Sequence, residues 1–274
     1  MIDHKIGVIV SLSSILEHGV AELQELGLSW IQLNSWDPAE ATVENAMRVK
    51  AILGDTVHIS SLWAGWPPPA VWDFIDGPLT LGIVPSGYRY QRMDGLKRGM
   101  DFAAQLGLTD VTTHMGFIPE NPSTTEYREV VAAVRELAQY AKRLGLWFNF
   151  ETGQETPTTL MRIIQDVGTG NLGINLDPAN LLLYGKANPI DAVGMLGQWI
   201  RGVHVKDGLY PTNGRELGRE TPVGEGMVNF PVLIPRLLAF GYLGAWIIER
   251  EISGPQQKTD IIRAKELLTK ILGS

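Results

Sequence analysis

The feature that most constrains the fold is a regular alternation of short apolar runs with helical segments that end at glycine. The first unit shows the pattern, because Ile6 to Val10 is a continuous apolar run and the helical segment after it ends at Gly27. Eight such units follow one another along the chain without a change in composition. Strands that are apolar on both faces are typical of parallel sheets covered by helices. The alternation therefore predicts an α/β fold.

The number of units favours a closed barrel over an open sheet. A chain of 274 residues matches a (β/α)8 TIM barrel, which typically has about 250 residues and eight parallel strands. No glycine-rich phosphate-binding motif follows the first strand, which argues against a dinucleotide-binding fold. We expect residues 1–274 to form a single (β/α)8 barrel domain.

Local signals predict where several elements begin and end. A capping box at Ser14 is expected to open the first helix, and Asp37 is expected to cap the second. The third strand is expected over residues 56–62. Two long segments, 63–88 and 208–229, are rich in residues that break regular structure and are expected to form functional loops.

Composition and charge exclude several functional classes. The net charge of −7 argues against a nucleic-acid partner, because such binding depends on neutralising phosphates with Lys and Arg. The absence of cysteine excludes disulfides and thiolate ligands. No apolar run is long enough to span a bilayer, and the segment from Met1 to Lys5 is too short and charged for a signal peptide. We expect a cytoplasmic protein without a membrane partner.

Four apolar runs end in a residue that can bind a metal, namely Glu151, Asp177, His204 and Glu249. The intervals between them, 26, 27 and 45 residues, are those of strand and helix units. The carboxyl ends of barrel strands meet at one face of the molecule. Any one of the four has an alternative as an isolated strand-end residue or a helix cap, but four in consecutive units favour a site. Three carboxylates and an imidazole suit Mn²⁺, Mg²⁺ or Co²⁺.

The segments around these residues resemble a known family. The resemblance lies in Phe150 to Glu155, Asn175 to Leu181, His204 to Asp207 and Val223 to Phe230. These segments resemble the xylose isomerase-like TIM barrel superfamily, and within it the sugar-phosphate isomerase/epimerase group that includes the ketose 3-epimerases. The resemblance covers essentially the whole chain. It implies that the four strand-end residues hold one divalent metal ion, with manganese expected first and magnesium or cobalt as alternatives.

The resemblance also implies an isomerase reaction in carbohydrate metabolism. A proton on the carbon next to a ketone is weakly acidic, and a metal ion stabilises the enediolate that its removal produces. Glu151 and Glu249 are the expected catalytic acid and base, one removing the proton and the other returning it to the opposite face. Asp177 and His204 are then mainly ligands, and the second nitrogen of His204 needs a partner. The expected activity is a 3-epimerase for ketoses or ketose phosphates.

Further polar and aromatic residues near the strand ends are candidate substrate contacts: Trp36, Trp63, Trp66, His114, Asn180, Lys206, Asp207 and Glu225. Tryptophans stack on the apolar face of a sugar, although loop tryptophans also pack lids. Asn180 and Tyr210 stand where the 3-epimerases have a substrate-contacting histidine and an arginine, so the metal site transfers better than the sugar specificity. Each of the polar candidates has a structural alternative, as a packed residue, a turn residue or a helix cap.

Three other residues complete the candidates. His58 lies inside an apolar strand and is expected in the core, while Arg215 and Arg219 are placed to meet a phosphate if the substrate carries one.

Other functions remain open at this stage. A keto-inositol or oxidised-sugar isomerase or dehydratase needs the same metal and base. The superfamily also contains DNA-repair endonucleases of the endonuclease IV type, which hold three metals with many histidines, whereas this chain has five histidines and an acidic charge. A non-catalytic barrel is a further alternative. The resemblance implies a homodimer or homotetramer.

Overall fold

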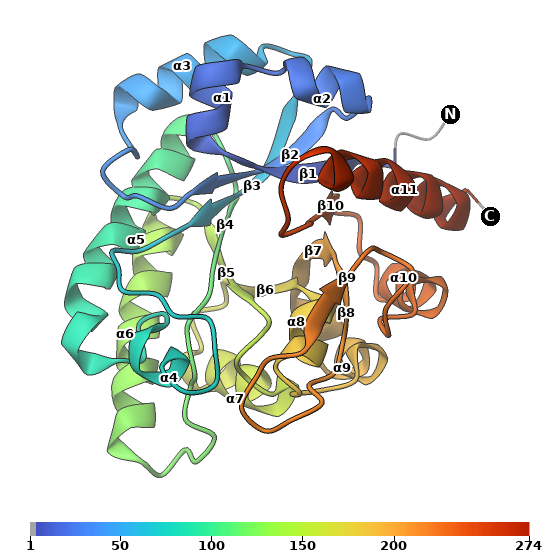
Figure 1. The fold of residues 1–274 in the computed structure, drawn as a ribbon. Helices are drawn as coiled ribbons and strands as arrows, with labels where there is room; N and C mark the ends of the chain where they lie inside the picture. Colours follow the sequence, from blue (N-terminus) through green and yellow to red (C-terminus); the bar gives the residue numbers. More distant parts are fainter. Residues whose placement is uncertain (1–3, 274) are drawn as a thin grey trace.

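The computed structural model describes residues 4–273. The prediction that the segment from Met1 to Lys5 is not a signal peptide therefore concerns residues that lie partly outside the described part of the chain. Eight parallel strands close into a barrel in the order β1-β10-β7-β6-β5-β4-β3-β2 (Figure 1). The predicted TIM barrel is therefore confirmed. The barrel strands are β1 (Ile6–Ser11), β2 (Trp30–Ser35), β3 (His58–Ala64), β4 (Asp110–Thr113), β5 (Trp147–Glu151), β6 (Leu172–Leu176), β7 (Ile200–Val205) and β10 (Trp246–Ile248).

Helices surround the barrel and connect its strands (Figure 1). They are α1 (Leu12–His18), α2 (Ala21–Leu26), α3 (Val43–Leu53), α4 (Gly77–Thr80), α5 (Ser86–Leu106), α6 (Thr125–Arg143), α7 (Pro157–Val167), α8 (Pro178–Leu183), α9 (Pro189–Leu196), α10 (Phe230–Ala239) and α11 (Pro255–Leu272). Within the described residues, no helix combines the length and the apolar character needed to cross a membrane.

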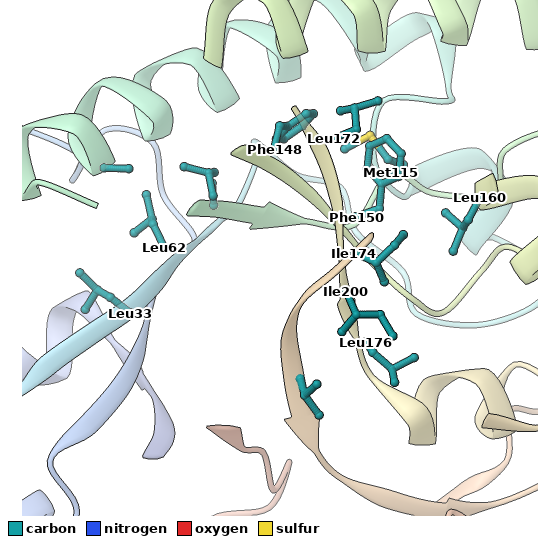
Figure 2. Packing of buried hydrophobic residues seen from close by; sticks show 14 of the residues in the cluster. Leu33, Leu62, Met115, Phe148, Phe150, Leu160, Leu172, Ile174, Leu176 and Ile200 are labelled. Atoms are coloured by element: carbon teal, nitrogen blue, oxygen red, sulfur yellow. The ribbon is translucent and has the colours of Figure 1, made fainter. Parts of the chain in front are cut away.

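Side-chain alternation along the strands separates an apolar layer from a polar barrel interior. Phe148 and Phe150 of β5 and Ile174 of β6 belong to the hydrophobic core (Figure 2). The residues that alternate with them along the strands, such as Asn149 in β5 and Asn175 in β6, are polar and also buried. Because successive residues of a strand point to opposite faces, a helix-facing apolar set leaves every second position for the interior. This parity aims the strand-end ligands into the barrel.

The first helical segment differs from the prediction. α1 begins after Ser11, whose Oγ accepts the backbone N–H of Ser14 at 3.1 Å, so Ser14 lies inside the helix. The segment then divides into α1 and α2 at Gly19, which has a φ of 67°. A left-handed residue cannot continue a right-handed helix, and glycine adopts this conformation without steric cost.

The second helix also begins later than predicted. Asp37 is not its cap, because its Oδ1 accepts the backbone N–H of Ala39 at 2.8 Å in a local turn. The cap is Thr42, whose hydroxyl accepts the N–H of Asn45 at 3.1 Å. Asp and Thr can both cap a helix, but here the side chain of Asp37 is used in the turn that precedes the helix.

The third strand runs over His58–Ala64 rather than residues 56–62. The prediction that His58 lies in the core is wrong, since its side chain is exposed and packs against Trp30 with ring centroids 5.0 Å apart. Its apolar neighbours gave the strand the appearance of being buried throughout.

Both long segments contain regular structure. In the second, β8 (Asp207–Leu209) pairs antiparallel with β9 (Arg219–Thr221). The first contains α4 and is fastened by the buried side chain of Arg92, which extends from α5. The Arg92 guanidinium donates hydrogen bonds at 2.5 to 3.2 Å to four backbone carbonyls, those of Pro67, Pro69, Thr80 and Gly82.

Candidate metal centre

The structure brings the four candidate ligands together at the carboxyl end of the barrel. One ligand atom from each of Glu151, Asp177, His204 and Glu249 lies within 4.8 Å of the others. His204 Nδ1 is 2.8 Å from Glu249 Oε2, 3.1 Å from Glu151 Oε1 and 3.5 Å from Asp177 Oδ2. Glu151 ends β5, His204 lies on β7, and the other two directly follow β6 and β10. Strand parity and barrel closure together place all four around one point.

The chemistry of these atoms fits a cation. His204 Nδ1, Asp177 Oδ2 and Glu249 Oε2 are buried and, within residues 4–273, have no hydrogen-bond partner. Buried polar atoms are almost always paired, and unpaired ones need an explanation. When the imidazole of His204 is neutral, as it must be to bind a metal, its Nδ1 lone pair and the carboxylate oxygens are all acceptors, so their convergence supplies no donor. A divalent cation would satisfy the whole set.

Electrostatics at the cluster favour a positive charge at its centre. Burial lowers the pKa of His204, but the carboxylates of Glu151 and Glu249 outweigh burial and hold that pKa well above its usual value. Burial alone would raise the pKa of Glu151, yet His114 and His204 hold it well below its usual range. In the metal-free protein a proton on His204 therefore supplies the counter-charge. Since a metal must displace that proton, metal affinity falls as pH is lowered.

Gln32 on β2 is the partner of the second His204 nitrogen. His204 Nε2 lies 2.8 Å from Gln32 Oε1, and Gln32 Nε2 donates to Ser61 Oγ at 2.9 Å. Because the amide nitrogen is engaged by Ser61, the amide oxygen faces the imidazole and accepts Nε2–H. This tautomer leaves the Nδ1 lone pair directed at the cluster.

Replacing Gln32 by leucine is expected to lower Mn²⁺ affinity by about 10- to 100-fold, because the imidazole loses the partner that fixes its tautomer and orientation. Titration calorimetry on the metal-free protein measures the change. Gln165→Leu, an exchange of the same kind at an exposed position, is the control. An unchanged affinity in Gln32→Leu would show that His204 is oriented without Gln32.

Lys206 is a buried cation beside the cluster. Its Nζ lies 3.1 Å from Glu251, 3.5 Å from Glu249 and 3.7 Å from Asp177, and it donates to Asn180 Oδ1 at 3.3 Å. Burial lowers the pKa of Lys206, but Glu249 and Asp177 more than compensate and raise it well above its usual value. Lys206 is therefore a permanent positive charge that offsets part of the carboxylate charge.

A cavity of about 470 Å³ opens over the cluster and has an aromatic wall. Trp36, Trp63, Trp72 and Tyr184 contribute to that wall. The indole N–H of Trp63 donates to Glu151 Oε2, and the rings of Trp36 and Trp63 lie 4.4 Å apart. Trp72 and Tyr184 were not predicted. Trp72 lies in an irregular segment, which gives no periodicity from which the direction of a side chain follows, and Tyr184 directly follows the short helix α8.

Two of the expected polar contacts line the cavity, and a third, Lys206, lies behind it. His114 lines it, with Nε2 3.4 Å from Glu151 Oε1. Asn180 also lines it, and its Nδ2 donates to the same Glu151 oxygen at 3.4 Å. Lys206 lies behind the carboxylates and is 1% exposed, so it reaches the cavity through its ion pairs.

The structure places Trp66 behind the cavity wall rather than in it. Trp66 is 3% exposed and packs with Trp63 and Leu81 in a small hydrophobic cluster. This corrects the expectation of a substrate contact: Trp66 supports Trp63, which carries the contact with Glu151.

The expectation that Asp207 and Glu225 contact the substrate is also corrected. The Asp207 carboxylate accepts backbone N–H groups at 2.9 to 3.1 Å from Gly208, Gly224, Gly226 and Val228, which orders the following loop. Asp207 has the opposite parity to His204 and Lys206 on this segment, so its side chain leaves the barrel interior. Glu225 and Arg215 are exposed on the loop, and Arg219 is exposed at the start of β9.

Glu155 is a buried carboxyl group that sequence reasoning missed. Both of its oxygens are buried without a hydrogen-bond partner in the described part of the chain. Burial raises the pKa of Glu155 to about 8, although His114 opposes the shift. The folded protein therefore holds a proton on Glu155 that the unfolded chain releases at much lower pH.

Glu155→Gln is expected to stabilise the protein increasingly as pH rises. Below the usual glutamate pKa both states carry the proton and there is no penalty. Between that pKa and about 8, folding requires uptake of a proton, so wild-type stability falls as pH rises, by a total on the order of a few kcal/mol. Thermal unfolding in EDTA at pH 5 and pH 8.5 measures the effect. A difference between variant and wild type that does not change with pH would contradict it.

Comparison with known proteins identifies the family and agrees with the fold. The family model for the xylose isomerase-like TIM barrel matches residues 20–271. A xylose isomerase domain protein from Planctomyces limnophilus is 32% identical, with a TM-score of 0.90 and coverage of 97% of this chain and 96% of that chain. A structure of L-ribulose 3-epimerase shares the fold, with 19% sequence identity and a TM-score of 0.73. The match covers 98% of this chain and 94% of that chain.

A sequence relative matches part of the chain. An uncharacterised protein of Methanocaldococcus jannaschii is 26% identical over 188 residues, which is 65% of this chain and 61% of that protein. The match therefore spans less than two thirds of that relative. Since the family model covers nearly the whole barrel and its strand-end ligands, the chain belongs to the xylose isomerase-like TIM barrel family.

Proposed function

We propose that this protein is a divalent-metal-dependent ketose 3-epimerase. The observation that carries the proposal is that Glu151 and Glu249, from opposite ends of the strand series β5 to β10, both line one cavity and both approach His204 Nδ1. Two carboxylates at one reacting carbon are the arrangement that proton removal and return to opposite faces requires. The L-ribulose 3-epimerase neighbour supports the same reaction class.

Glu151, Asp177, His204 and Glu249 would hold the metal ion. The oxygen-rich donor set suits Mn²⁺, with Mg²⁺ and Co²⁺ as alternatives. When bound, the cation supplies positive charge that polarises the ketone and acidifies the neighbouring C–H group.

The protein's own carboxylates move the proton. The lowered pKa of Glu151 keeps its carboxylate ionised and able to accept a proton at neutral pH. Breaking the C3–H bond sends the proton to one carboxylate and the electron pair toward the carbonyl oxygen. The other group of the pair, which enters the reaction as the carboxylic acid, returns its proton to the opposite face of C3 and inverts that carbon. Trp63 fixes the orientation of Glu151 by donating its indole N–H.

The aromatic wall supports a sugar substrate. Trp36, Trp63 and Trp72 present ring surfaces to the cavity, and such surfaces pack against the C–H face of a sugar. Asn180 and His114 supply polar groups beside Glu151 that can hydrogen-bond hydroxyls.

The test is incubation of the metal-loaded protein in D₂O with a panel of ketoses, followed by NMR. Deuterium at C3, an inverted C3 and an intact carbon skeleton are the expected result, with metal-stripped protein as the control. Loss of water would identify a dehydratase instead, and formation of an aldose would identify an aldose-ketose isomerase. Either outcome replaces the proposal.

A further inference from the structure

The charges around the cavity bear on which sugars it admits. Besides the metal ligands, the cavity is lined by Glu251, whose side chain is 59% exposed. Glu251 and Glu249 both contact the ammonium of Lys206, so they lie on the same side of the cavity. A substrate held at Glu249 therefore meets a second carboxylate close to the reacting end.

Neighbouring acids neutralise the basic groups here. Arg250 is the one lysine or arginine that lines the cavity among residues 4–273, and its guanidinium contacts Glu220 at 3.0 Å and Asp260 at 2.8 Å. Lys206 is shared among Glu251, Glu249 and Asp177. Neither cation is available to pair with an anionic substrate.

The total charge stays negative even with a metal in place. When one of the catalytic pair holds the proton, five negative charges remain on the six carboxyl groups of the cavity and its ion pairs, those of Glu151, Asp177, Glu249, Glu251, Glu220 and Asp260. They face two positive charges on a divalent cation and one each on Lys206 and Arg250. A phosphate group brings about −1.5 to −2 further charges at pH 7. Inside a cavity with low-dielectric walls, like charges repel each other more strongly than they do in bulk water. Sugar hydroxyls, in contrast, donate hydrogen bonds to carboxylates.

We propose that the substrate is an unphosphorylated, neutral sugar and that Glu251 is the residue that sets this specificity. The inference rests on the proposed function, because it names the substrate class of the same site. Glu251 acts in two ways: it places a negative charge on the cavity wall, and it neutralises Lys206 at 3.1 Å. Removing the carboxylate of Glu251 takes one negative charge from the cavity wall and frees Lys206 from one of its partners. Both changes favour the binding of an anion.

The first experiment compares deuterium exchange with matched substrates: D-fructose against D-fructose 6-phosphate, and D-ribulose against D-ribulose 5-phosphate. In wild type, kcat/KM is expected to favour the unphosphorylated sugar by at least about tenfold. Glu251→Gln is expected to reduce this preference by about tenfold, and Glu251→Lys by more. Glu266→Gln, which removes the same charge from the exposed face of α11, is expected to leave the preference unchanged. A wild-type preference for phosphates, or an unchanged ratio in both Glu251 variants, would overturn the inference.

A binding experiment separates this inference from the proposed function. Saturation-transfer NMR on the metal-free protein compares D-glucitol with D-glucitol 6-phosphate, neither of which can react. Weaker binding of the phosphate, with a smaller difference in Glu251→Gln, supports the inference even if no ketose exchanges deuterium. Binding of the phosphate that is no weaker than that of glucitol overturns it, whatever the exchange experiment shows.

Discussion

Epimerisation is expected to fall by about 10²- to 10⁴-fold when either Glu151 or Glu249 is replaced by glutamine. Glutamine keeps one oxygen that can approach a metal, but it cannot accept and return a proton. In the proposed mechanism the two carboxylates serve opposite faces of the sugar, so neither can substitute for the other. Both lie at the cavity and within 3.1 Å of His204 Nδ1.

The measurement combines NMR of the C3 epimers with metal analysis of each purified variant at saturating Mn²⁺. Glu266→Gln on α11 is the control for the loss of one surface charge. A variant that retains metal and epimerises at the wild-type rate would remove that glutamate from the mechanism. Loss of both metal and activity in a variant would show that the replaced glutamate acts as a metal ligand, without showing that it transfers a proton.

Asp177→Asn is expected to lower Mn²⁺ affinity by at least about 100-fold while leaving the metal-free fold almost as stable as the wild type. The two oxygens of Asp177 have different roles. Oδ1 caps α8 by accepting the N–H of Asn180 at 2.8 Å, whereas Oδ2 faces the cluster and has no hydrogen-bond partner within residues 4–273. Asparagine can keep the cap but loses the charge.

Thermal unfolding with and without Mn²⁺ distinguishes the two roles of Asp177. Wild type is expected to gain about 2.7 kcal/mol at a metal concentration 100 times its Kd, a gain that Asp177→Asn lacks at the same concentration. Asp177→Ala also removes the cap and is expected to lose about 1 kcal/mol more in the absence of metal. Equal stabilisation of Asp177→Asn and wild type by Mn²⁺ would show that Asp177 is not a ligand.

The order of the elements was predictable because strand and helix units repeat in the sequence. The clustering of the four candidate ligands followed from one rule, that parallel strands end at the same face. Parity along a strand extends that rule: Lys206 shares the direction of His204, while Asp207 points the other way and binds its own loop. Strict use of this alternation would have predicted from the sequence that Lys206 points toward the site and Asp207 away from it.

Contacts across the barrel could not be predicted in the same way. Gln32 and His204 are 172 positions apart, and only closure of the sheet, with β1 between β2 and β10, brings their strands to the same interior. A polar residue inside an apolar strand was the available signal. In the segment that carries Trp66 and Trp72, no period tells which indole faces the cavity, because the packing partners there are distant in sequence.

The way Arg92 fastens that segment bears on how freely the binding surface can change. Its guanidinium bonds only to main-chain carbonyls of the segment. Every amino acid carries such a carbonyl, so side chains between the anchor points can be exchanged without releasing the anchor. Trp72 lies between two of those points, at Pro69 and Thr80. The fold thus holds a cavity-lining tryptophan on a segment whose side chains can change, while the four candidate metal ligands at the ends of β5, β6, β7 and β10 stay fixed.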